Sequence, residues 1–346
     1  MLALLTKLAE HHPLSREDAS RAMELMLQGK ASPEEIAGFL VGLRSRGETS
    51  EELTGLTATM RSFAVSVEAP KAAVDIVGTG GDRSGSFNIS TATAFVCRGA
   101  GATVAKHGNR SVSSLCGSAD VLETLGVKTA LGKEGVEHCL KEAGMAFLFA
   151  PYFHPALKYV MPVRKALGVR TCFNILGPLC NPAGVKRHLI GAFSVDIAAE
   201  MARILVNLGS EKVFCVHAED GLDEISLSGP THVFWAEESS NGAQVAERVV
   251  TPEEFGLSRA PLSSIVGGSA LENAAILKRV LQNEGGPKKD IVVLNAAFAL
   301  VAAGVSSSVE DGIIAARTSI ESGAAFDALE QLKIVSNAAS TPNGTP

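Results

Sequence analysis

The stretch DIVGTGGDRSGSFNIST, residues 75–91, decides the fold of this chain. A strand-like run enters it, four glycines follow at positions 78, 80, 81 and 85, and a helical pattern begins near Thr91. Glycines at such a turn allow consecutive backbone N–H groups to converge on an anion, and the N-terminus of the next helix adds partial positive charge. We interpret the turn as a cradle for a phosphate or diphosphate group; a merely tight strand-to-helix turn is the plainer alternative.

This glycine turn departs from the two common nucleotide-binding motifs. Arg83 stands where G-x-G-x-x-G needs its third glycine, and no GK[S/T] follows as in a P-loop. A tight strand-to-helix turn that binds no ligand would explain only one or two of the four glycines. The polar side chains of the turn favour the phosphate interpretation, and they are Asp82, Ser86, Asn88, Ser90 and Thr91.

After Pro70, short β-rich runs alternate with longer helical patterns, which predicts an α/β fold. Most of the runs are too uniformly apolar to have a solvated face, so we expect a largely parallel sheet with helices on both sides. The expected strands are 72–77, 102–105, 146–149, 188–193 and 212–216, followed by a hairpin over 230–250. The expected helices are 91–100, 117–125, 133–143, 155–167, 196–208, 270–282, 290–304 and 308–321.

The first 65 or so residues carry only helical patterns. Three N-cap hydroxyls each precede a carboxylate by three residues, and Pro33 stands at a first helical position, where a missing N–H is tolerated. We therefore expect three capped helices in a small N-terminal helical domain. The capped pairs are Ser15 with Asp18, Ser32 with Glu35, and Thr49 with Glu52.

The composition is that of a globular protein of about two domains: 346 residues, 46% of them apolar and 20% charged, with a formal net charge of −6. This balance argues against a disordered chain and against unspecific nucleic-acid binding by the whole surface. The longest apolar run, residues 291–305, is shorter than the roughly 20 residues of a membrane span. The N-terminus lacks the features of an export signal, and six cysteines without metal-ligand spacing indicate reduced thiols. We expect a cytoplasmic protein that binds no membrane.

A second polar stretch, KHGNRSVSSLCGSAD at residues 106–120, follows the next predicted strand. Loops at the carboxyl ends of parallel strands share one edge of the sheet, where open α/β sheets bind ligands. An exposed polar loop is the alternative. His107 is either a general base or, as we favour, a hydrogen-bonded loop residue. The groups suited to anionic oxygens are the Lys106 ammonium and the side chains of Asn109, Ser111, Ser113, Ser114 and Ser118.

The third stretch, VHAEDGLDEIS at residues 216–226, places Asp220, Asp223 and Glu224 after a strand. The adjacent Asp223 and Glu224 offer hard oxygen ligands of the kind that Mg²⁺ prefers, and Mg²⁺ often shares substrate phosphates. A solvated acidic loop is the ordinary explanation of such a pair. Only the phosphate cradle elsewhere in the chain makes the metal interpretation the better one.

Positive charge is concentrated in two stretches that the net charge hides. Residues 143–195 contain no Asp or Glu and six Lys or Arg, and residues 78–118 contain one Asp against four Lys or Arg. Both stretches suit anionic substrates. Within the first, we choose Arg164 as a bidentate clamp for a carboxylate; a surface-helix arginine is the equal alternative. Aromatic residues interleave with these cations, so a nucleic-acid binder is a second hypothesis, although Asp223 and Glu224 count against it.

Together these motifs resemble those of the anthranilate phosphoribosyltransferase family of tryptophan biosynthesis. Related nucleoside phosphorylases of similar fold have a different lysine and serine loop, and they are the competing enzyme class. Two departures are mild: Ala218 replaces the glycine expected after His217, and the last helix lacks an expected tyrosine. The matching stretches run in one order over nearly the whole chain: GTGGD at 78–82, NIST at 88–91, KHGNRSVSS at 106–114, GSADVLE at 117–123, HPALKYVMPVRKALGVRT at 154–171, FNILGPLCNP at 173–182 and DGLDE at 220–224.

The resemblance implies a fold of the nucleoside phosphorylase/phosphoribosyltransferase type and a homodimer. A helical domain, residues 1–68 with a returning segment near 155–180, would join an α/β domain, residues 69–335, built on a central mostly parallel sheet. Residues 336–346 would form a flexible tail. The implied reaction transfers the phosphoribosyl group of 5-phosphoribosyl 1-diphosphate to the amine of anthranilate, with Mg²⁺ as cofactor and no nucleic-acid partner.

The resemblance also assigns site residues one by one. Catalysis would rest on Lys106, Asn109 and Arg164. Anthranilate would lie beside Gly78, Asn109 and Arg164, and Mg²⁺ would be bound through Ser90, Asp223 and Glu224. The residues that would hold 5-phosphoribosyl 1-diphosphate are Gly78, Gly81, Asp82, Ser86, Asn88, Ile89, Ser90, Thr91, Lys106, His107, Gly108, Asn109, Arg110, Ser111, Val112, Ser113, Ser114 and Ser118.

Overall fold

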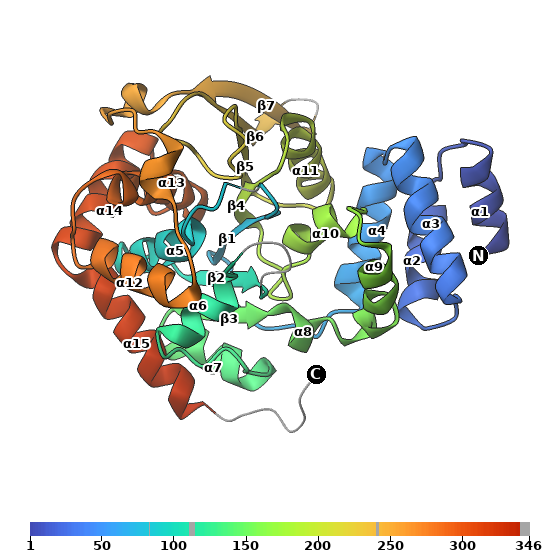
Figure 1. Ribbon diagram of the computed structural model, residues 1–346, viewed down its shortest axis with the longest axis horizontal. Helices are drawn as coiled ribbons and strands as arrows, with labels where there is room; N and C mark the ends of the chain where they lie inside the picture. Colours follow the sequence, from blue (N-terminus) through green and yellow to red (C-terminus); the bar gives the residue numbers. More distant parts are fainter. Residues whose placement is uncertain (83, 111–114, 240–241, 340–346) are drawn as a thin grey trace.

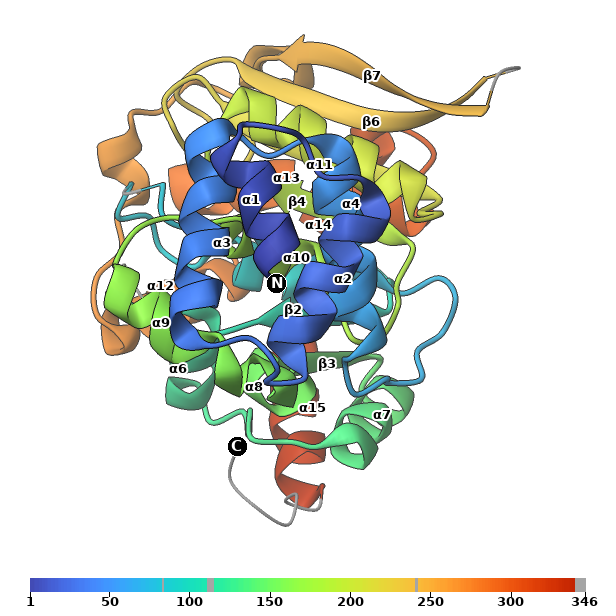
Figure 2. The ribbon, with the colours of Figure 1, turned by 90° about the vertical axis from the view of Figure 1, so that its right-hand side faces the viewer.

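The computed structural model describes residues 1–82, 84–110, 115–239 and 242–339. A bundle of helices lies at one end and an α/β body at the other, with a linking segment between them (Figure 1). The expected fold class is confirmed by this arrangement. In the view turned by 90°, the bundle stands in front of the sheet, and the hairpin of β6 (Thr231–Ser239) and β7 (Gly242–Val250) reaches out beyond it (Figure 2).

Four helices form the bundle: α1 (Leu2–Ala9), α2 (Arg16–Leu27), α3 (Pro33–Arg46) and α4 (Ser50–Ser62). The three predicted N-caps are confirmed, because the side chains of Ser15, Ser32 and Thr49 each accept a hydrogen bond from the backbone N–H three residues on. α1 precedes them without a side-chain cap. Inside the bundle, the buried Glu52 carboxylate accepts the Leu14 N–H at 2.7 Å and pairs with Arg46, which fixes the loop before α2 onto α4.

Among the residues that the structure describes, one seven-stranded sheet forms the body, in the order β3-β2-β1-β4-β5-β6-β7. The first five strands run parallel, and β6 and β7 add an antiparallel hairpin, so the prediction of a mostly parallel sheet is confirmed. β2 continues to Gly108, so Lys106 and His107 lie on a strand and not in the loop after it. The parallel strands are β1 (Val74–Gly78), β2 (Val104–Gly108), β3 (Met145–Phe149), β4 (Arg187–Gly191) and β5 (Lys212–Ala218).

Each face of the sheet has its own core, because successive residues of a strand point to opposite faces. Leu189 and Val216 belong to one core, whereas their neighbours Ile190 and Cys215 belong to the core that extends into the bundle. The first core is covered by α5 (Ile89–Gly99), α6 (Ser118–Thr124), α7 (Lys133–Glu142), α12 (Ala270–Leu281), α13 (Pro287–Ala303), α14 (Val309–Glu321) and α15 (Ala324–Ala338), and the second by α10 (Phe173–Leu179) and α11 (Val195–Asn207). Two 3-10 helices, η2 (Pro252–Phe255) and η3 (Leu262–Ile265), lead from the hairpin to α12.

The linking segment runs from β3 to the bundle and back. The sequence predicts one helix over 155–167, but the structure divides it into the 3-10 helix η1 (Pro155–Tyr159) and α9 (Met161–Leu167), after the short α8 (Ala150–Phe153). Pro162 lacks the N–H that a continuous helix would need at that point, so the chain starts a new helix instead. Val160 and Val163 are buried in the same core as Phe39 of α3.

The chain ends in a helix that the sequence does not predict, since the expected helices end with 308–321 and α15 follows them. α15 continues to Ala338, and the buried Ser336 hydroxyl accepts the Lys128 N–H at 3.1 Å, so a flexible tail cannot begin at residue 336. Residues 340–346 lie outside the described residues. The long apolar run is α13, a buried helix as predicted. In the described ranges, no helix has the length and apolar character needed to cross a membrane.

His188 on β4 makes the stability depend on pH. Its side chain is fully buried, and burial, with a smaller effect from Arg61, lowers the pKa of its imidazole to about 3. In the unfolded chain the pKa is about 6.5, so below that value the unfolded state binds a proton that the folded state does not. Between pH 7 and pH 5, His188 should therefore lower the free energy of unfolding by about 2 kcal/mol.

Urea unfolding at both pH values measures this contribution in the wild type and in His188→Asn. The wild type should lose about 2 kcal/mol more than the variant on going from pH 7 to pH 5. Equal losses would show that His188 does not carry this pH dependence.

Candidate active site

The carboxyl ends of β1 and β4 form the centre of the candidate site. The two strands are neighbours, and Gly78 at the end of β1 pairs with Gly191 at the end of β4. From here the chain continues from β1 to β2 on one side and from β4 to β5 on the other. A crevice opens where connections diverge in this way, and open α/β sheets bind their ligands there.

Asp223 lies directly over this glycine pair. A Cβ atom on Gly191 would lie 1.5 Å from the Asp223 carbonyl oxygen, and one on Gly78 would lie 2.5 Å from its carboxylate. The same carboxylate accepts the Gly80 N–H at 2.8 Å. Because a side chain at either strand end would displace Asp223, the two glycines allow the acidic loop to meet the glycine turn.

Other contacts fold the acidic loop itself. The Asp220 carboxylate accepts hydrogen bonds from the Leu222 N–H at 3.0 Å and from the hydroxyl groups of Ser226 and Ser228. It therefore stabilises the conformation of the loop. The buried Asn295 of α13 accepts the Ile225 N–H at 2.9 Å from below. Asp223 and Glu224 are therefore held from both sides and do not depend on solvent for their position.

Three carboxylates crowd at the glycine turn. Burial, and then the charge of Asp82, raise the pKa of Asp223 to about 7. Burial and then Asp223 raise the pKa of Glu224, and Lys106 opposes that rise. One oxygen of Asp82 is buried without a hydrogen-bond partner in the part of the chain that the structure describes. Such a group of carboxylates favours the binding of a cation, which would oppose the rise in the pKa values of Asp223 and Glu224.

The donors around these carboxylates suit Mg²⁺. Asp223 and Glu224 offer carboxylate oxygens, and Ser90 offers a hydroxyl at the start of α5, so all are hard donors. Ser90 is tied to both neighbours: its backbone hydrogen-bonds Glu224, and its hydroxyl accepts the Lys106 ammonium at 3.2 Å. Among the described residues, no cluster of three or more His, Cys, Asp or Glu could hold a metal by itself. A metal here would complete its shell with water or phosphate oxygens.

The glycine turn runs into the N-terminus of α5. Gly80 and Gly81 have φ angles of +65° and +73°, left-handed values that glycine adopts without strain. Asn88 is the N-cap residue, but its side chain does not cap α5; it donates to the Cys116 carbonyl at 3.3 Å and accepts from Asn273 at 3.0 Å. The first N–H groups of α5 are thus not capped by a side chain of their own N-cap, as suits an anion site.

The other predicted residues of the turn differ in exposure. Ile89 is buried in the core below α5, so only its backbone can reach a ligand. Ser86 is half-buried and bridges to Val266, which pairs the turn with the segment before α12. Thr91 is fully buried, and its hydroxyl has no hydrogen-bond partner in the described ranges.

Lys106 and His107 leave β2 toward opposite faces of the sheet. The Lys106 side chain is almost fully buried, and its ammonium donates to the Ile76 carbonyl as well as to Ser90. The His107 ring lies 5.3 Å from that of His154, and burial lowers the pKa of His107 to about 3. A neutral imidazole with so low a pKa is a poor proton acceptor at pH 7, which favours a structural role for His107.

The loop after β2 is organised by α6. The Ser118 hydroxyl donates to the Asn109 carbonyl at 3.2 Å, and the Asn109 side chain accepts the Arg110 N–H at 2.7 Å. Gly108 lies under this contact, because a Cβ there would be 2.5 Å from the Ser118 hydroxyl oxygen. Asn109 and Ser118, both predicted ligand residues, therefore lie against each other.

Arg110 turns toward α6. Its guanidinium pairs with Asp120 at 2.9 Å and with Glu123 at 2.7 Å, and it lies 5.6 Å from the centre of the Phe149 ring. Its charge is thus shared with two carboxylates, and a role in binding diphosphate would require these pairs to open. The next four predicted residues, Ser111, Val112, Ser113 and Ser114, lie outside the described residues.

Two arginines of the linking segment differ in their contacts, and only Arg170 contacts the glycine turn. Arg164 lies with its guanidinium 5.0 Å from the centre of the Phe173 ring, and it forms no ion pair with a described residue. Arg170 contacts the glycine turn itself: it donates to the Gly81 carbonyl and lies 4.5 Å from the centre of the Phe193 ring. The structure therefore leaves Arg164 available to a carboxylate, while Arg170 joins the linking segment to the turn.

Two residues that are not among the predicted site residues, Gly191 and Arg170, also lie at this site. Gly191 had a usable signal, since a glycine at the end of an apolar strand indicates close approach of another backbone. Arg170 was counted only as one cation of the basic stretch, because nothing in its local sequence indicates a contact with Gly81.

The second hypothesis, a nucleic-acid binder, loses its main support. The aromatic rings that interleave with the cations of residues 143–195 are mostly buried: Phe147, Phe149, Phe153 and Phe173 are at most 8% exposed. Buried rings cannot stack on nucleic-acid bases.

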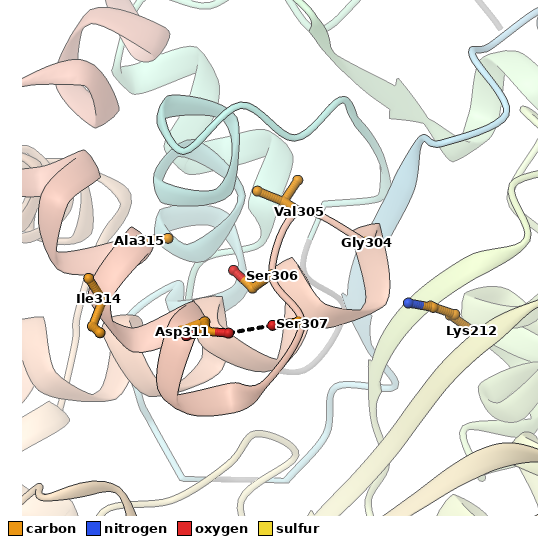
Figure 3. A pocket seen from close by; sticks show the side chains of 8 residues that line it. All are labelled: Lys212, Gly304, Val305, Ser306, Ser307, Asp311, Ile314 and Ala315. Carbon is orange, nitrogen blue, oxygen red and sulfur yellow. Dashed lines mark hydrogen bonds between the residues drawn. The ribbon is translucent and has the colours of Figure 1, made fainter.

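A pocket of about 570 Å³ lies at the opposite edge of the sheet (Figure 3). Lys212, the first residue of β5, borders it, and so does the turn from α13 to α14, where Ser307 donates to Asp311. The acidic loop follows the other end of β5, so this pocket is separate from the candidate site.

Two family models cover this chain. The α/β domain of a glycosyl transferase family matches residues 70–326, and the helical bundle domain of a glycosyl transferase family matches residues 2–64. Among curated proteins, the chain is 54% identical to anthranilate phosphoribosyltransferase of Salinibacter ruber over 98% of this chain and 99% of the relative. It is 50% identical to the enzyme of the same name from Nitrobacter hamburgensis over 97% of this chain and 98% of the relative.

Solved structures agree with these matches. Anthranilate phosphoribosyltransferase from Thermus thermophilus superposes with a TM-score of 0.90 at 42% identity, covering 96% of this chain and 99% of that chain. The Saccharomyces cerevisiae enzyme, in complex with PRPP and Mg, superposes with a TM-score of 0.87 at 30% identity, covering 97% of this chain and 98% of that chain.

Replacing Gly191 with alanine should disrupt the site. The added methyl group would overlap the Asp223 carbonyl, so the acidic loop must move, and we expect the free energy of unfolding to fall by about 3 kcal/mol. Gly285→Ala is the matched control, because a Cβ at Gly285 meets no atom of the described residues within 4 Å. Denaturant titration of both variants measures the difference. Equal free energies of unfolding for the two variants would mean that Asp223 does not lie in close contact with Gly191 at the end of β4.

Proposed function

The chain belongs to the anthranilate phosphoribosyltransferase family, and on that premise we propose that it transfers the phosphoribosyl group of 5-phosphoribosyl 1-diphosphate to the amine of anthranilate. The step would depend on Mg²⁺, serve tryptophan biosynthesis, and yield N-(5-phosphoribosyl)anthranilate and diphosphate. One observation carries the proposal. The acidic loop, the glycine turn and the Lys106 ammonium meet over the paired strand ends Gly78 and Gly191, which supports a site for a metal-bound diphosphate.

The charges of the site suit a diphosphate and its metal. Asp223, Glu224 and the Ser90 hydroxyl would hold Mg²⁺, which when bound would neutralise part of the diphosphate charge. The backbone of residues 78–82, the N-terminus of α5 and Lys106 would bind the phosphate oxygens. The S. cerevisiae relative solved with PRPP and Mg supports this pairing of ligand and metal.

The bond changes of the step are simple. The bond from the anomeric carbon to the diphosphate oxygen breaks, a carbon–nitrogen bond forms, and the amine releases one proton to solvent. The transition state would have ribosyl-cation character similar to that in glycoside hydrolysis. Because an aromatic amine is already neutral at pH 7, no strong base is needed to deprotonate it before the attack. The rate enhancement would come from positioning the amine and from neutralising the charge of the leaving diphosphate.

The anthranilate carboxylate would be bound by Arg164. Its guanidinium has no carboxylate partner in the described ranges, and its planar fork matches a carboxylate. Asn109 and the Gly78 backbone would complete the anthranilate site. Arg170 supports this location, because its contact with Gly81 brings the linking segment against the glycine turn.

The remaining assignments follow from the family. We propose a cytoplasmic homodimer, a helical domain of residues 1–68 joined by residues 155–180, and an α/β domain from residue 69 to the end of the last helix. The bundle core supports this division, because it includes Val160, Val163 and Leu176 of the returning segment.

Purified protein should convert anthranilate and 5-phosphoribosyl 1-diphosphate into a product separable from anthranilate by chromatography only when Mg²⁺ is present. A variant with Asp223→Asn and Glu224→Gln should require at least about tenfold more Mg²⁺ for half-maximal activity, since each lost carboxylate weakens the site. Glu219→Gln, an exposed carboxylate of the same loop, is the control.

Two outcomes would contradict the proposal. Release of free base from a nucleoside and phosphate, without adduct formation, would indicate a nucleoside phosphorylase. An unchanged Mg²⁺ titration in the double variant would remove Asp223 and Glu224 as metal ligands.

Arg164→Ala should raise the KM for anthranilate by about a hundredfold and change the KM for 5-phosphoribosyl 1-diphosphate by less than about threefold, because only the carboxylate loses its charged partner. Lys165→Ala, the exposed neighbouring cation, should leave both values near those of the wild type. Steady-state kinetics with each substrate varied in turn gives both constants. Equal changes in the two KM values would make Arg164 a structural residue.

A further inference from the structure

β1 and β2 separate before they reach the site. Their register contains one pair, Val74 with Val104, whereas the register of β1 with β4 contains five pairs and that of β2 with β3 also contains five. The two strands therefore stop pairing at the level of Asp75. Backbone groups exposed by such a separation need other partners, because a buried unpaired N–H or C=O group is costly.

Three side chains supply these partners. The Asp75 carboxylate accepts the His107 N–H at 3.0 Å, and the Asn181 amide donates to the Ala105 carbonyl at 2.8 Å. The Lys106 ammonium donates to the Ile76 carbonyl of β1. We call Asp75, Lys106 and Asn181 the polar wedge, since together they fill the place of ladder hydrogen bonds between β1 and β2.

The polar wedge is deeply buried. Asp75 is 0% exposed, Lys106 is 1% exposed and Asn181 is 3% exposed. Two closely paired apolar strands would avoid the cost of burying an ammonium and a carboxylate here. What the separation achieves is a place for the Lys106 side chain between the strands, which brings its ammonium to 3.2 Å from the Ser90 hydroxyl at the site.

Asp75 and Asn181 contact His107 and Ala105, the residues of β2 that flank Lys106. Burial lowers the pKa of the Lys106 ammonium, and the negative charge of Asp75 opposes this fall more than the charges of Glu224 and Asp223 do. Asn181 lies in the turn between α10 and β4, where its side-chain oxygen accepts the Ala183 N–H at 2.8 Å. One residue thus fixes β2 to β1, and the other fixes β2 to the end of the linking segment.

We propose that Asp75 and Asn181 are positioning residues for substrate binding: by holding β1 and β2 apart, they place the Lys106 ammonium where it meets the diphosphate of 5-phosphoribosyl 1-diphosphate. This inference rests on the proposed function of Lys106. Both residues are buried beneath the site and cannot contact substrate themselves. Their role is therefore indirect and lies in the interior of the sheet.

The test measures the affinity for 5-phosphoribosyl 1-diphosphate directly, by calorimetry with Mg²⁺, in Asn181→Ala, Asp75→Ala and Asp75→Asn. Asn181→Ala and Asp75→Ala should each weaken binding about tenfold, the change expected from one hydrogen bond of ordinary strength, and leave the KM for anthranilate within about twofold. Asp75→Asn keeps an acceptor for the His107 N–H, so it should recover affinity to within about threefold of the wild type.

A second measurement separates positioning from general destabilisation. In a Lys106→Met background, Asn181→Ala should cause no further loss of affinity, because its effect acts through the ammonium. Glu52→Gln is the matched control: it alters a buried carboxylate of the bundle, so it should lower thermal stability without changing the affinity for 5-phosphoribosyl 1-diphosphate. If Asp75→Ala does not fold, Asn181→Ala and the double variant still decide the question.

Two results would overturn the inference. The first is an unchanged affinity in both Asn181→Ala and Asp75→Ala, or in Asn181→Ala by itself if Asp75→Ala does not fold. The second is additive loss of affinity in Asn181→Ala with Lys106→Met. If the wild type itself fails to bind 5-phosphoribosyl 1-diphosphate, the proposed function fails instead, so the two failures are distinguishable.

Discussion

The contact of Asp223 with Gly78 and Gly191 is the constraint on which the rest of the site depends. Two neighbouring parallel strands end at the same level, and neither has a side chain where the acidic loop crosses them. The loop can then reach the Gly80 N–H, which joins the carboxylates proposed to bind the metal to the turn proposed to bind phosphate. Chemistry that needs a cation and a diphosphate in contact requires this juxtaposition, and a single methyl group at Gly191 would remove it.

Much of the architecture could be predicted from local patterns. The three capped bundle helices, the mostly parallel sheet and the buried helix α13 follow from spacing and hydrophobicity, and the structure confirms them. The helix expected over 155–167 was wrong, because the prolines of that segment divide it. A tail from residue 336 was wrong as well, since no local signal shows that the Ser336 hydroxyl meets Lys128.

The residues of the candidate site could be predicted where they belong to one local motif, but not where two segments distant in the sequence meet. The glycine turn, Lys106 and the Asp223–Glu224 pair each have a local signal in residue type and spacing. Gly191, Arg170, Asp75 and Asn181 depend on which strands are neighbours and on where β1 and β2 separate, and sequence periodicity does not report either. A polar residue within an apolar strand is the one local sequence signal for such positions. A carboxylate such as Asp75 is costly to bury, so its presence in a buried strand indicates a specific role.

The measurement that tests this account most directly is the position of a divalent cation in crystals grown with 5-phosphoribosyl 1-diphosphate and Mn²⁺ in place of Mg²⁺. Anomalous scattering identifies the metal without assumptions about the ligand. The account predicts a Mn²⁺ peak beside Asp223 and Glu224, with the diphosphate against the glycine turn and Lys106. A peak elsewhere, such as the pocket beside Lys212 and Asp311, or a diphosphate bound away from the ends of β1 and β4, would contradict it.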